Sequence, residues 1–286
     1  MSSFTMAVGK AEIVALSDMN CVYPTPLAEL WPNVTLSSWE PYRDLYPDTF
    51  EGIHMRIEIG CYLVRSEGRT ILIDTGYGAG PIDYIGGLRG ELMDDLARNK
   101  IDPAEVDTVF ISHLHVDHVG WNTTERDGRF APTFPNARYI AHQADLDYFR
   151  RPEVIAASRY PFMDRFVEPL VDLGVFDAIS EDTDLTSEAK AIHTPGHTPG
   201  HMSLMVSSQG QQALIQGDVL IHPAQVTQED WCPLFDADCA TATLTRSKVL
   251  DQVEADSTTV VSCHFPAPGF GRVVRRESKR YWQAGL

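Results

Sequence analysis

The sequence predicts an α/β (α+β) protein in which two sheets pack face to face with helices on their outer sides, an αββα four-layer sandwich. Apolar runs of strand length and helical segments recur in both halves of the chain, and metal-binding side chains follow several of the strands. The 286 residues exceed the usual size of one domain, but sheet-rich architectures of this length often form one. We therefore expect residues 1–286 to form a single domain.

The first half begins with a strand and an irregular segment. The run Ala11–Ser17 alternates enough for a strand, whereas residues 19–52 are rich in proline and aromatic residues and show little periodicity. We predict an irregular N-terminal arm there that is packed on other parts of the protein, because its aromatic side chains are costly to leave in water. The elements predicted after it are a hairpin of strands 61–64 and 70–73, a glycine-rich loop at 76–90, a helix at 91–99 and a strand at 107–112.

The second half repeats the alternation of strands and helices. A helix is predicted at 240–255, with Asp238 as its N-terminal cap. Three more helices are predicted at 143–150, 153–160 and 165–171. The predicted strands lie at 138–141, 189–193, 202–207, 212–217 and 258–263. These strands supply enough apolar sequence for two sheets.

Composition limits the partners of this chain. The net charge of −17 and the pI near 4.9 disfavour nucleic acid and an anionic membrane surface. No run approaches the ~20 apolar residues that span a bilayer, and the N-terminus has no pattern of an export signal. We therefore expect a cytoplasmic protein that acts on a small molecule and binds neither nucleic acid nor membrane.

The five cysteines include no CxxC pair, so we expect free thiols in a reducing cytosol rather than a disulfide framework. Cys263 stands next to His264 at the end of a predicted strand. Side-chain alternation along a strand points Cys263 to the opposite face from His264. A buried structural thiol is the expected role.

The segment His113-Leu-His-Val-Asp-His118 concentrates four metal-binding side chains directly after a predicted buried strand. Imidazoles and a carboxylate at this density suit zinc or a similar borderline metal. Residues at this spacing cannot all face one small ion. His113 and His115 therefore point toward one metal, and Asp117 and His118 toward a second.

Further candidate ligands stand where later strands give way to loops, the usual place for functional side chains on a rigid scaffold. His197 and His201 belong to the segment Thr-Pro-Gly-His-Thr-Pro-Gly-His after the strand at 189–193. Asp218 follows Gly217 at the end of the next hairpin, and His264 follows the last predicted strand.

These four motifs, in this order and spacing, resemble the metallo-β-lactamase superfamily from about residue 60 to residue 272, and within it the methyl parathion hydrolase-like and acyl-homoserine lactonase-like branch. The resemblance implies that His113, His115 and His197 bind one metal. It implies that Asp117, His118 and His264 bind a second metal, and that Asp218 bridges the two. Asp74 and His201 would orient these ligands from behind. Zinc is the expected metal for both positions, with iron, manganese and cobalt as alternatives.

The resemblance also implies a hydrolase. Two metals about 3.5–4 Å apart lower the pKa of bound water and supply a bridging hydroxide at neutral pH, while they polarise the bond under attack. Asp117 and Asp218 are the expected catalytic carboxylates, with Asp117 able to accept or relay a proton. The arm at 19–52 would cover the mouth of the site or form the contact of a homodimer, or would simply pack on the edge of the core.

The sequence also limits which substrates the expected hydrolase would accept. The lactonases carry a tyrosine three residues after the bridging aspartate, where this chain has Ile221. We expect a lactone or carboxylic ester of an uncharged, partly apolar small molecule, with Trp121, His222 and Phe270 as candidate pocket residues. A phosphotriester is the alternative substrate. A mono-iron persulfide dioxygenase and a thioesterase are the remaining alternatives.

Overall fold

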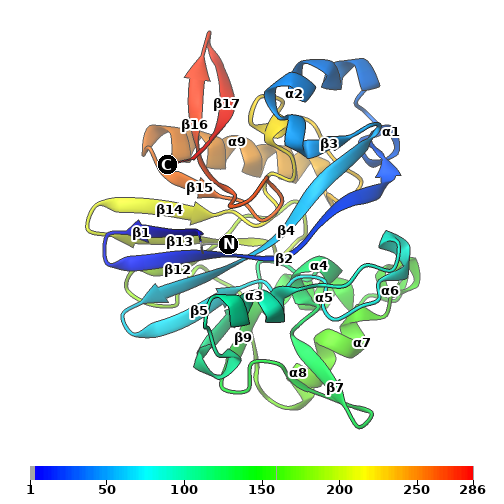
Figure 1. The fold of residues 1–286 in the computed structure, drawn as a ribbon, viewed down its shortest axis with the longest axis vertical. Coiled ribbons are helices and arrows are strands. Elements are labelled where there is room, and N and C mark those ends of the chain that lie inside the picture. The colour runs from blue at the N-terminus through cyan, green and yellow to red at the C-terminus, as the bar shows by residue number, and fades with distance from the viewer. Residues whose placement is uncertain (1–3, 159, 286) are drawn as a thin grey trace.

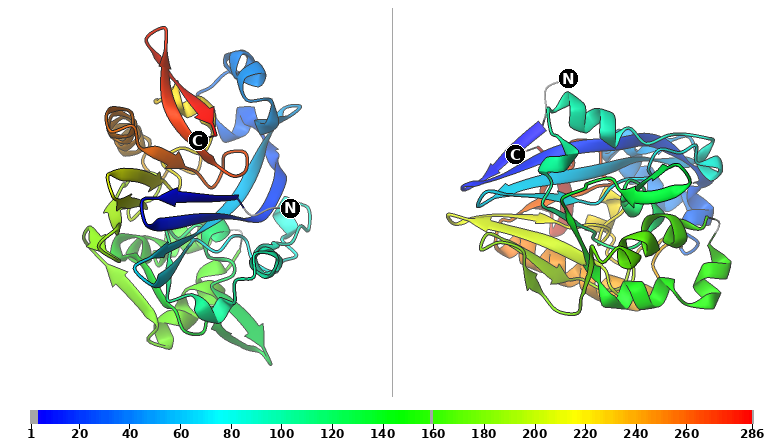
Figure 2. Two further views of the ribbon diagram at one scale, coloured as in Figure 1. Left: turned by 60° about the vertical axis from the view of Figure 1, so that its left-hand side comes forward. Right: turned by 90° about the horizontal axis from the view of Figure 1, so that it is seen from below.

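The computed structural model describes residues 4–158 and 160–285 and has two large sheets packed face to face (Figures 1 and 2). Within these residues the first sheet has eight strands in the order β1-β2-β4-β5-β6-β9-β10, with β3 paired to β4. The second has seven in the order β11-β12-β13-β14-β15-β16-β17, and β7 and β8 form a separate hairpin. The predicted αββα sandwich is confirmed.

The bounds of the elements follow the sequence patterns in most places. The strands are β1 Phe4–Val8, β2 Ala11–Pro26, β3 Phe50–Glu51, β4 His54–Ser66, β5 Arg69–Ile73, β6 Thr108–Phe110, β7 Thr123–Arg126, β8 Arg129–Pro132, β9 Arg138–His142, β10 Phe176–Ile179, β11 Thr183–Asp184, β12 Ala189–His193, β13 Met202–Ser208, β14 Gln211–Ile215, β15 Thr259–Val261, β16 Phe270–Arg276 and β17 Lys279–Ala284. The helices are α1 Leu27–Leu30, α2 Glu40–Leu45, α3 Leu92–Arg98, α4 Val116–Val119, α5 Gln143–Phe149, α6 Pro152–Ala157, α7 Phe162–Phe166, α8 Glu168–Asp172 and α9 Cys239–Ala255. Short 3₁₀ turns are η1 Leu36–Trp39, η2 Pro47–Thr49, η3 Asp83–Ile85, η4 Pro103–Glu105 and η5 Pro223–Val226.

The space between the sheets is filled by apolar side chains from both. Strands β4, β5 and β6 contribute Val64, Ile71 and Phe110 among others, and strands β13 and β14 contribute residues such as Leu204 and Ile215. All five are buried. Burial of this kind stabilises the folded state by about 25 cal/mol per Å² of apolar surface, so this layer fixes the sheets relative to one another.

Helices cover the outer face of each sheet (Figure 1). Leu92 and Leu96 of α3, with residues of α5, α7 and α8, pack on the first sheet. Helix α9 lies on the second sheet through its apolar stripe, which includes Val249 and Leu250. The predicted cap is confirmed, because the Asp238 carboxylate accepts hydrogen bonds from the backbone N–H groups of Ala240 and Thr241.

The N-terminal arm is more regular than expected. Strand β2 continues to Pro26, well past the predicted end at Ser17, and α1, η1, α2 and η2 follow it. The prediction of an irregular segment at 19–52 is therefore wrong. Prolines at the first turns of α2 and η2 start these helices instead of breaking them. Trp31 and Trp39 are fully buried against β2, β4 and η5, so within the chain the arm packs on the edge of the core.

Several short elements had no clear sequence signal. The helix predicted at 165–171 is divided at Val167 into α7 and α8. The C-terminal hairpin β16–β17 and the edge strands β10 and β11 were not predicted. Each of these is short or lies at an edge, where the partner strand determines the conformation more than the local residues do. Across the described ranges 4–158 and 160–285, no helix is both long enough and apolar enough to cross a bilayer.

The cysteine prediction needs a correction. Cys232 and Cys239 form a disulfide, whereas Cys21, Cys61 and Cys263 are free and buried. The loop after η5 folds back onto the first turn of α9 and brings the two Cα atoms to 5.8 Å. An argument from the count and spacing of cysteines misses such a pair, because the pairing depends on how the loop returns.

Candidate metal centre

The seven candidate ligands come from four segments at the seam between the sheets. His113 and His115 lie in the loop after β6, and Asp117 and His118 lie in the first turns of α4. The second sheet contributes the other three residues, which stand after strands β12, β14 and β15: His197, Asp218 and His264. The fold thus brings strand ends of both sheets to one place.

Gly217 shows why this turn takes the sequence Gly-Asp. Its φ is +58°, and a Cβ atom there would lie 2.6 Å from Nε2 of His201. That nitrogen accepts a 2.8 Å hydrogen bond from the backbone N–H of Asp218. His201 is fully buried, so the hydrogen bond fixes the position at which the Asp218 side chain leaves the backbone.

Three imidazole nitrogens form the first cluster of donors. Nδ1 of His115 lies 2.9 Å from Nε2 of His113 and 2.9 Å from Nε2 of His197. These three residues make up one of the two metal-sized groups among the described residues. They are the three that the family resemblance assigned to the first metal.

The second cluster contains His118, His264, Asp218 and the Cys263 thiol, with the Asp117 carboxylate beside it. Nε2 of His118 and Nε2 of His264 each lie 3.7 Å from Oδ2 of Asp117. Asp218 lies between the clusters, with Oδ2 3.1 Å from Nε2 of His264 and 3.3 Å from Nε2 of His197. Its Oδ1 lies 3.5 Å from Nε2 of His118. The Asp218 carboxylate therefore lies within reach of both sets of nitrogens.

The outward nitrogens of the histidines carry protons. Nδ1 of His197 faces the Asp236 carboxylate at 2.9 Å, Nδ1 of His118 faces the Asp74 carboxylate at 2.9 Å, and Nδ1 of His264 faces the Glu58 carbonyl at 2.8 Å. These oxygens only accept hydrogen bonds, so each Nδ1 must be the donor.

His113 is fixed in the same way. The Ser112 hydroxyl donates to Asp74 and therefore accepts from Nδ1 of His113 at 3.0 Å. With each of the four Nδ1 atoms protonated, Nε2 is the ring atom that faces the inside of the site and can bind a metal ion or a second proton.

Lone pairs that converge on a carboxylate repel one another unless a positive charge lies between them. Nε2 of His118 is buried and has no hydrogen-bond partner among the described residues. Buried polar atoms without partners are rare in folded proteins. The donor set of imidazoles and carboxylates at this spacing fits divalent zinc or a similar ion.

The pKa shifts of His118, His264 and Asp218 also favour a positive ion at this site. Burial alone would lower the pKa of His118 and of His264, but Asp218 and other nearby groups raise both well above the usual value. Burial alone would raise the pKa of Asp218, but His264 and His118 lower it well below its usual value. This cluster therefore favours positive charge at its centre.

Two supporting residues escaped the sequence analysis. Asp236 holds Nδ1 of His197 and also accepts from Nη2 of Arg246 at 3.2 Å. Arg246 is buried in α9 and donates to the backbone carbonyls of Val219 and Glu229 as well. Its signal was present in the sequence, because positions 246, 249, 250 and 253 share one face of α9. No local pattern marks Asp236, which is distant in sequence from His197.

Cys263 faces the site, and the prediction that it points to the opposite face is wrong. Its Sγ lies 3.2 Å from Oδ1 of Asp218 and 3.3 Å from the carbonyl of Gly217. Strand β15 ends at Val261, so side-chain alternation no longer applies to Cys263 and His264. The thiol is within hydrogen-bond distance of the carboxylate that joins the two clusters.

The structure gives the candidate pocket residues other contacts. Nε1 of Trp121 donates to Asp18, and Phe270 is buried between the sheets next to Tyr62. His222 is buried, with Nε2 bonded to Thr49 and Nδ1 accepting from the first turn of η5. Neither nitrogen of His222 is left to meet a substrate, so we propose no substrate contact for it.

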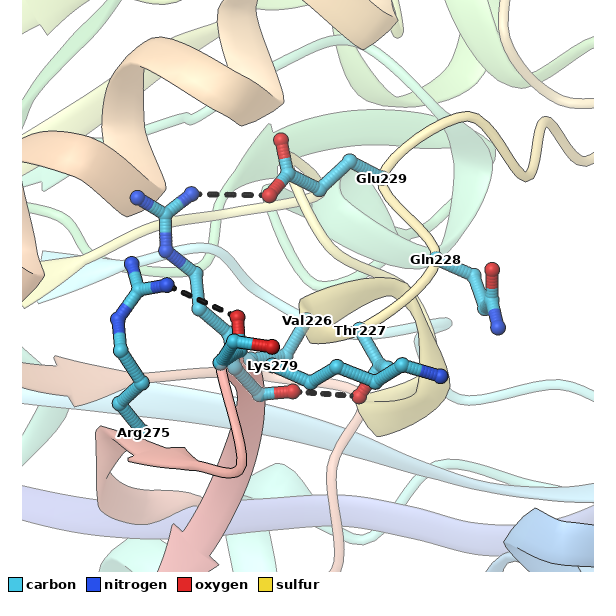
Figure 3. A pocket seen from close by; sticks show the side chains of 8 residues that line it. Val226, Thr227, Gln228, Glu229, Arg275 and Lys279 are labelled. Carbon is cyan, nitrogen blue, oxygen red and sulfur yellow. Dashed lines mark hydrogen bonds and ion pairs between the residues drawn. The ribbon is translucent and has the colours of Figure 1, made fainter.

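A surface pocket of about 350 Å³ lies elsewhere, between η5 and the β16–β17 hairpin (Figure 3). It shares no residue with the metal centre. Arg275 and Arg280 on its wall are bonded to the carboxylates of Glu254 and Glu229. These ion pairs neutralise its positive charge, so the pocket is a poor site for an anion.

The fold and the site define a class of protein with an αββα sandwich that carries a paired imidazole–carboxylate centre at the seam of its two sheets. The chain belongs to the metallo-beta-lactamase superfamily, whose family model matches residues 59–264.

Relatives of this chain within the superfamily include proteins named N-acyl homoserine lactonases. The chain is 30% identical over 181 residues to the N-acyl homoserine lactonase AttM of Rhizobium radiobacter, covering 61% of this chain and 64% of AttM. It is 25% identical over 213 residues to an N-acyl homoserine lactonase of a Bacillus species, covering 67% of this chain and 76% of that protein. The chain thus spans slightly less than two thirds of the length of AttM.

Solved structures share the fold over the whole chain. A hydrolase of the beta-lactamase superfamily, AbOPH, superposes with a TM-score of 0.83 at 23% identity and covers 98% of this chain and 96% of its own. AidC, a dizinc quorum-quenching lactonase, superposes with a TM-score of 0.82 at 20% identity and covers 100% of this chain and 98% of its own. At these identities the likeness supports the fold.

Proposed function

We propose that this protein is a metal-dependent hydrolase that opens lactones, or cleaves carboxylic esters, of uncharged and partly apolar small molecules. The observation that carries the proposal is the convergence of imidazole lone pairs on Asp218 between two donor clusters. Such a centre suits hydrolysis that needs no nucleophilic serine or cysteine. Relatives named N-acyl homoserine lactonases support a lactone as the substrate class.

The ligand assignment follows the two clusters. His113, His115 and His197 would hold the first metal ion. His118, His264 and Asp117 would hold the second, and Asp218 would contact both. When bound, two divalent ions supply a water molecule of lowered pKa as the nucleophile and polarise the bond under attack. Zinc is our choice for both positions, because imidazole nitrogens dominate the donor set.

The protein's own residues orient the candidate ligands and relay a proton. Asp74 and Asp236 hold the rings of His118 and His197 by their Nδ1 protons, which keeps each Nε2 directed into the site. Asp117 is the more exposed of the two carboxylates, with 17% of its side chain accessible against 5% for Asp218. Asp117 is therefore the residue placed to pass a proton between the site and solvent.

The alternative substrate is a phosphotriester. Ile221 occupies the position of the lactonase tyrosine and is buried among apolar side chains of the arm. The chain therefore lacks that donor to a lactone carbonyl. A phosphotriester needs no such donor, because the metals alone can polarise its phosphoryl oxygen. The presence of two donor clusters favours both hydrolases over a mono-iron dioxygenase.

The test is hydrolysis by zinc-loaded protein, followed by a pH indicator, with four substrates side by side. The substrates are an acyl-homoserine lactone, a simple γ-lactone, an aryl ester and a phosphotriester, each also run with metal-free protein. We expect the fastest turnover with a lactone. Preference for the phosphotriester, with inert lactones, would support the alternative function of a phosphotriesterase. No turnover of any of the four would refute the proposal.

A further inference from the structure

A buried carboxylate lies behind the first metal cluster and belongs to neither ligand set. Asp145, near the start of α5, is fully buried. Its Oδ2 accepts hydrogen bonds from the backbone N–H of Leu114 at 3.0 Å and from the Thr198 hydroxyl at 2.9 Å. Its Oδ1 accepts from the backbone N–H of Gly200 at 2.6 Å.

The three donors come from the two segments that carry the first cluster. Leu114 lies between His113 and His115, and Thr198 directly follows His197. One oxygen of Asp145 therefore takes a hydrogen bond from each segment. If either segment moves away from the other, that oxygen loses a bond.

The backbone of the neighbouring loop packs tightly against Asp145. A Cβ atom on Gly200 would lie 2.5 Å from the backbone nitrogen of Asp145 and 2.8 Å from its Oδ1. The loop after His197 can approach α5 this closely only because residue 200 is glycine. A shared support of this kind matters because a 2.9 Å contact from Nδ1 of His115 to Nε2 of His197 joins the same two segments on the other side.

Burial of a carboxylate costs free energy, so a buried carboxylate is expected to have a structural role. Burial raises the pKa of Asp145, and the N–H and hydroxyl donors offset the effect only in part. An apolar residue of similar size would avoid this cost but could not join the two segments. Residues that hold ligands from behind are typically worth about 10- to 100-fold in metal affinity.

We propose that Asp145 is a positioning residue that sets the separation between the His113–His115 segment and His197, and thereby the affinity of the first metal position. This inference rests on the ligand assignment proposed above. Asp145 touches neither the metal nor the substrate. It acts by keeping the three nitrogens at ligand distance before the ion arrives, so that binding does not have to order two loops.

The test is Asp145→Asn. The amide keeps the size of the side chain but places an NH₂ group against at least one of the three donors, so one segment is released. Metal affinity is measured by titration of the metal-free protein with Co²⁺ against a competing chelator, with the visible absorption of bound cobalt as the signal. We expect the first position to bind about 10- to 100-fold more weakly than in the wild type.

Asp18→Asn is the matched control. Asp18 is also fully buried and accepts hydrogen bonds from the Tyr77 and Leu92 backbones and from Trp121, away from the first cluster. It should lose stability but keep the cobalt affinity of the first position. Thr198→Val removes only one of the three donors of Asp145 and should give an intermediate loss, which keeps the test available if Asp145→Asn does not fold.

The outcomes separate this inference from the proposed function. Equal cobalt affinity in wild type and Asp145→Asn, with lactone hydrolysis intact, would overturn the inference alone. An equal loss in Asp145→Asn and Asp18→Asn would also overturn it, because the effect would then be general destabilisation. A wild-type protein that binds no pair of metals would refute the ligand assignment itself.

Discussion

At the scale of single residues, Asp218 has the most demanding position. It is buried, it is held by His201 through its backbone, and its side chain faces nitrogens of both clusters. Few other arrangements would justify the burial of a carboxylate among four imidazole rings, since an isolated buried charge is very costly. The residue is tolerated because the site as a whole favours positive charge.

We predict that Asp218→Ala lowers kcat/KM by more than about 100-fold, since even residues behind the ligands are worth about 10- to 100-fold. It should also reduce the bound metal below two ions per chain. The measurement is hydrolysis of the best substrate together with metal content after gel filtration. Asp177→Ala, which breaks an exposed ion pair with Arg138, is the control and should behave as wild type. A normal rate with two bound metals in Asp218→Ala would contradict the bridging role.

The burial of Asp18 leads to a prediction of how the stability of the protein depends on pH. Burial raises the pKa of Asp18 to about 6, although four hydrogen bonds oppose the shift. The folded state then binds a proton that the unfolded state, with a pKa near 3.8, has already released. From this group, stability is highest below pH 3.8 and falls as the pH rises toward 6.

The free energy of unfolding of the wild type, minus that of Asp18→Asn, should therefore fall by about 2 kcal/mol between pH 4 and pH 7. Urea unfolding of both proteins in the presence of the same chelator measures this difference, and the shared ligands cancel in the subtraction. A difference that stays constant with pH, or that grows, would show that Asp18 is ionised as easily in the folded state as in the unfolded one.

At the scale of elements, the loop between η5 and α9 connects a disulfide to His197, a candidate metal ligand. Asp236 lies between Cys232 and Cys239, and the backbone N–H groups of Ala237 and Asp238 bond to the carbonyls of His197 and Gly196. The disulfide closes this loop on the first turn of α9. A crosslink of this loop length restricts the unfolded chain by about 2.5 kcal/mol.

We predict that the double variant Cys232→Ser/Cys239→Ser loses about 2–3 kcal/mol of unfolding free energy and binds the first metal more weakly. The measurements are urea unfolding and cobalt titration, with and without a phosphine reductant. The reductant should shift the wild type toward the variant and leave the variant unchanged. If the reductant affects neither protein, the disulfide makes no contribution to the site.

Elements also show where sequence patterns succeed and fail. The residues of the His113–His118 segment, the cap at Asp238 and the central strands were predictable, because each depends on neighbours within a few positions. Cys263 was misplaced because strand β15 ends two residues earlier than the apolar pattern suggests. Asp145 and Asp236 were invisible, since their partners Leu114 and His197 are distant in sequence and only the fold brings them together.

At the scale of the whole molecule, the candidate metal centre lies where the two sheets meet. The first sheet supplies four candidate ligands and the second supplies three, and the same sheets share one apolar core. We propose that residues 1–286 fold as one domain, because neither sheet can bury its inner face without the other. Metal bound at the seam would then stabilise the whole fold and not only the loops around the site.

This arrangement predicts a large effect of metal removal on thermal stability. Ligands that bind only the folded state stabilise it by about 4 kcal/mol at a thousandfold excess over Kd, which for a chain of this size corresponds to roughly 10 °C in Tm. Calorimetry before and after chelation should show that shift within a single transition. Zn²⁺ should reverse it and Mg²⁺ should not, because magnesium prefers oxygen ligands. Asp218→Ala should show a much smaller shift, since both of its metal positions have lost a ligand. Two transitions that respond differently to zinc would contradict the single domain, and an unchanged Tm would contradict metal binding at the seam.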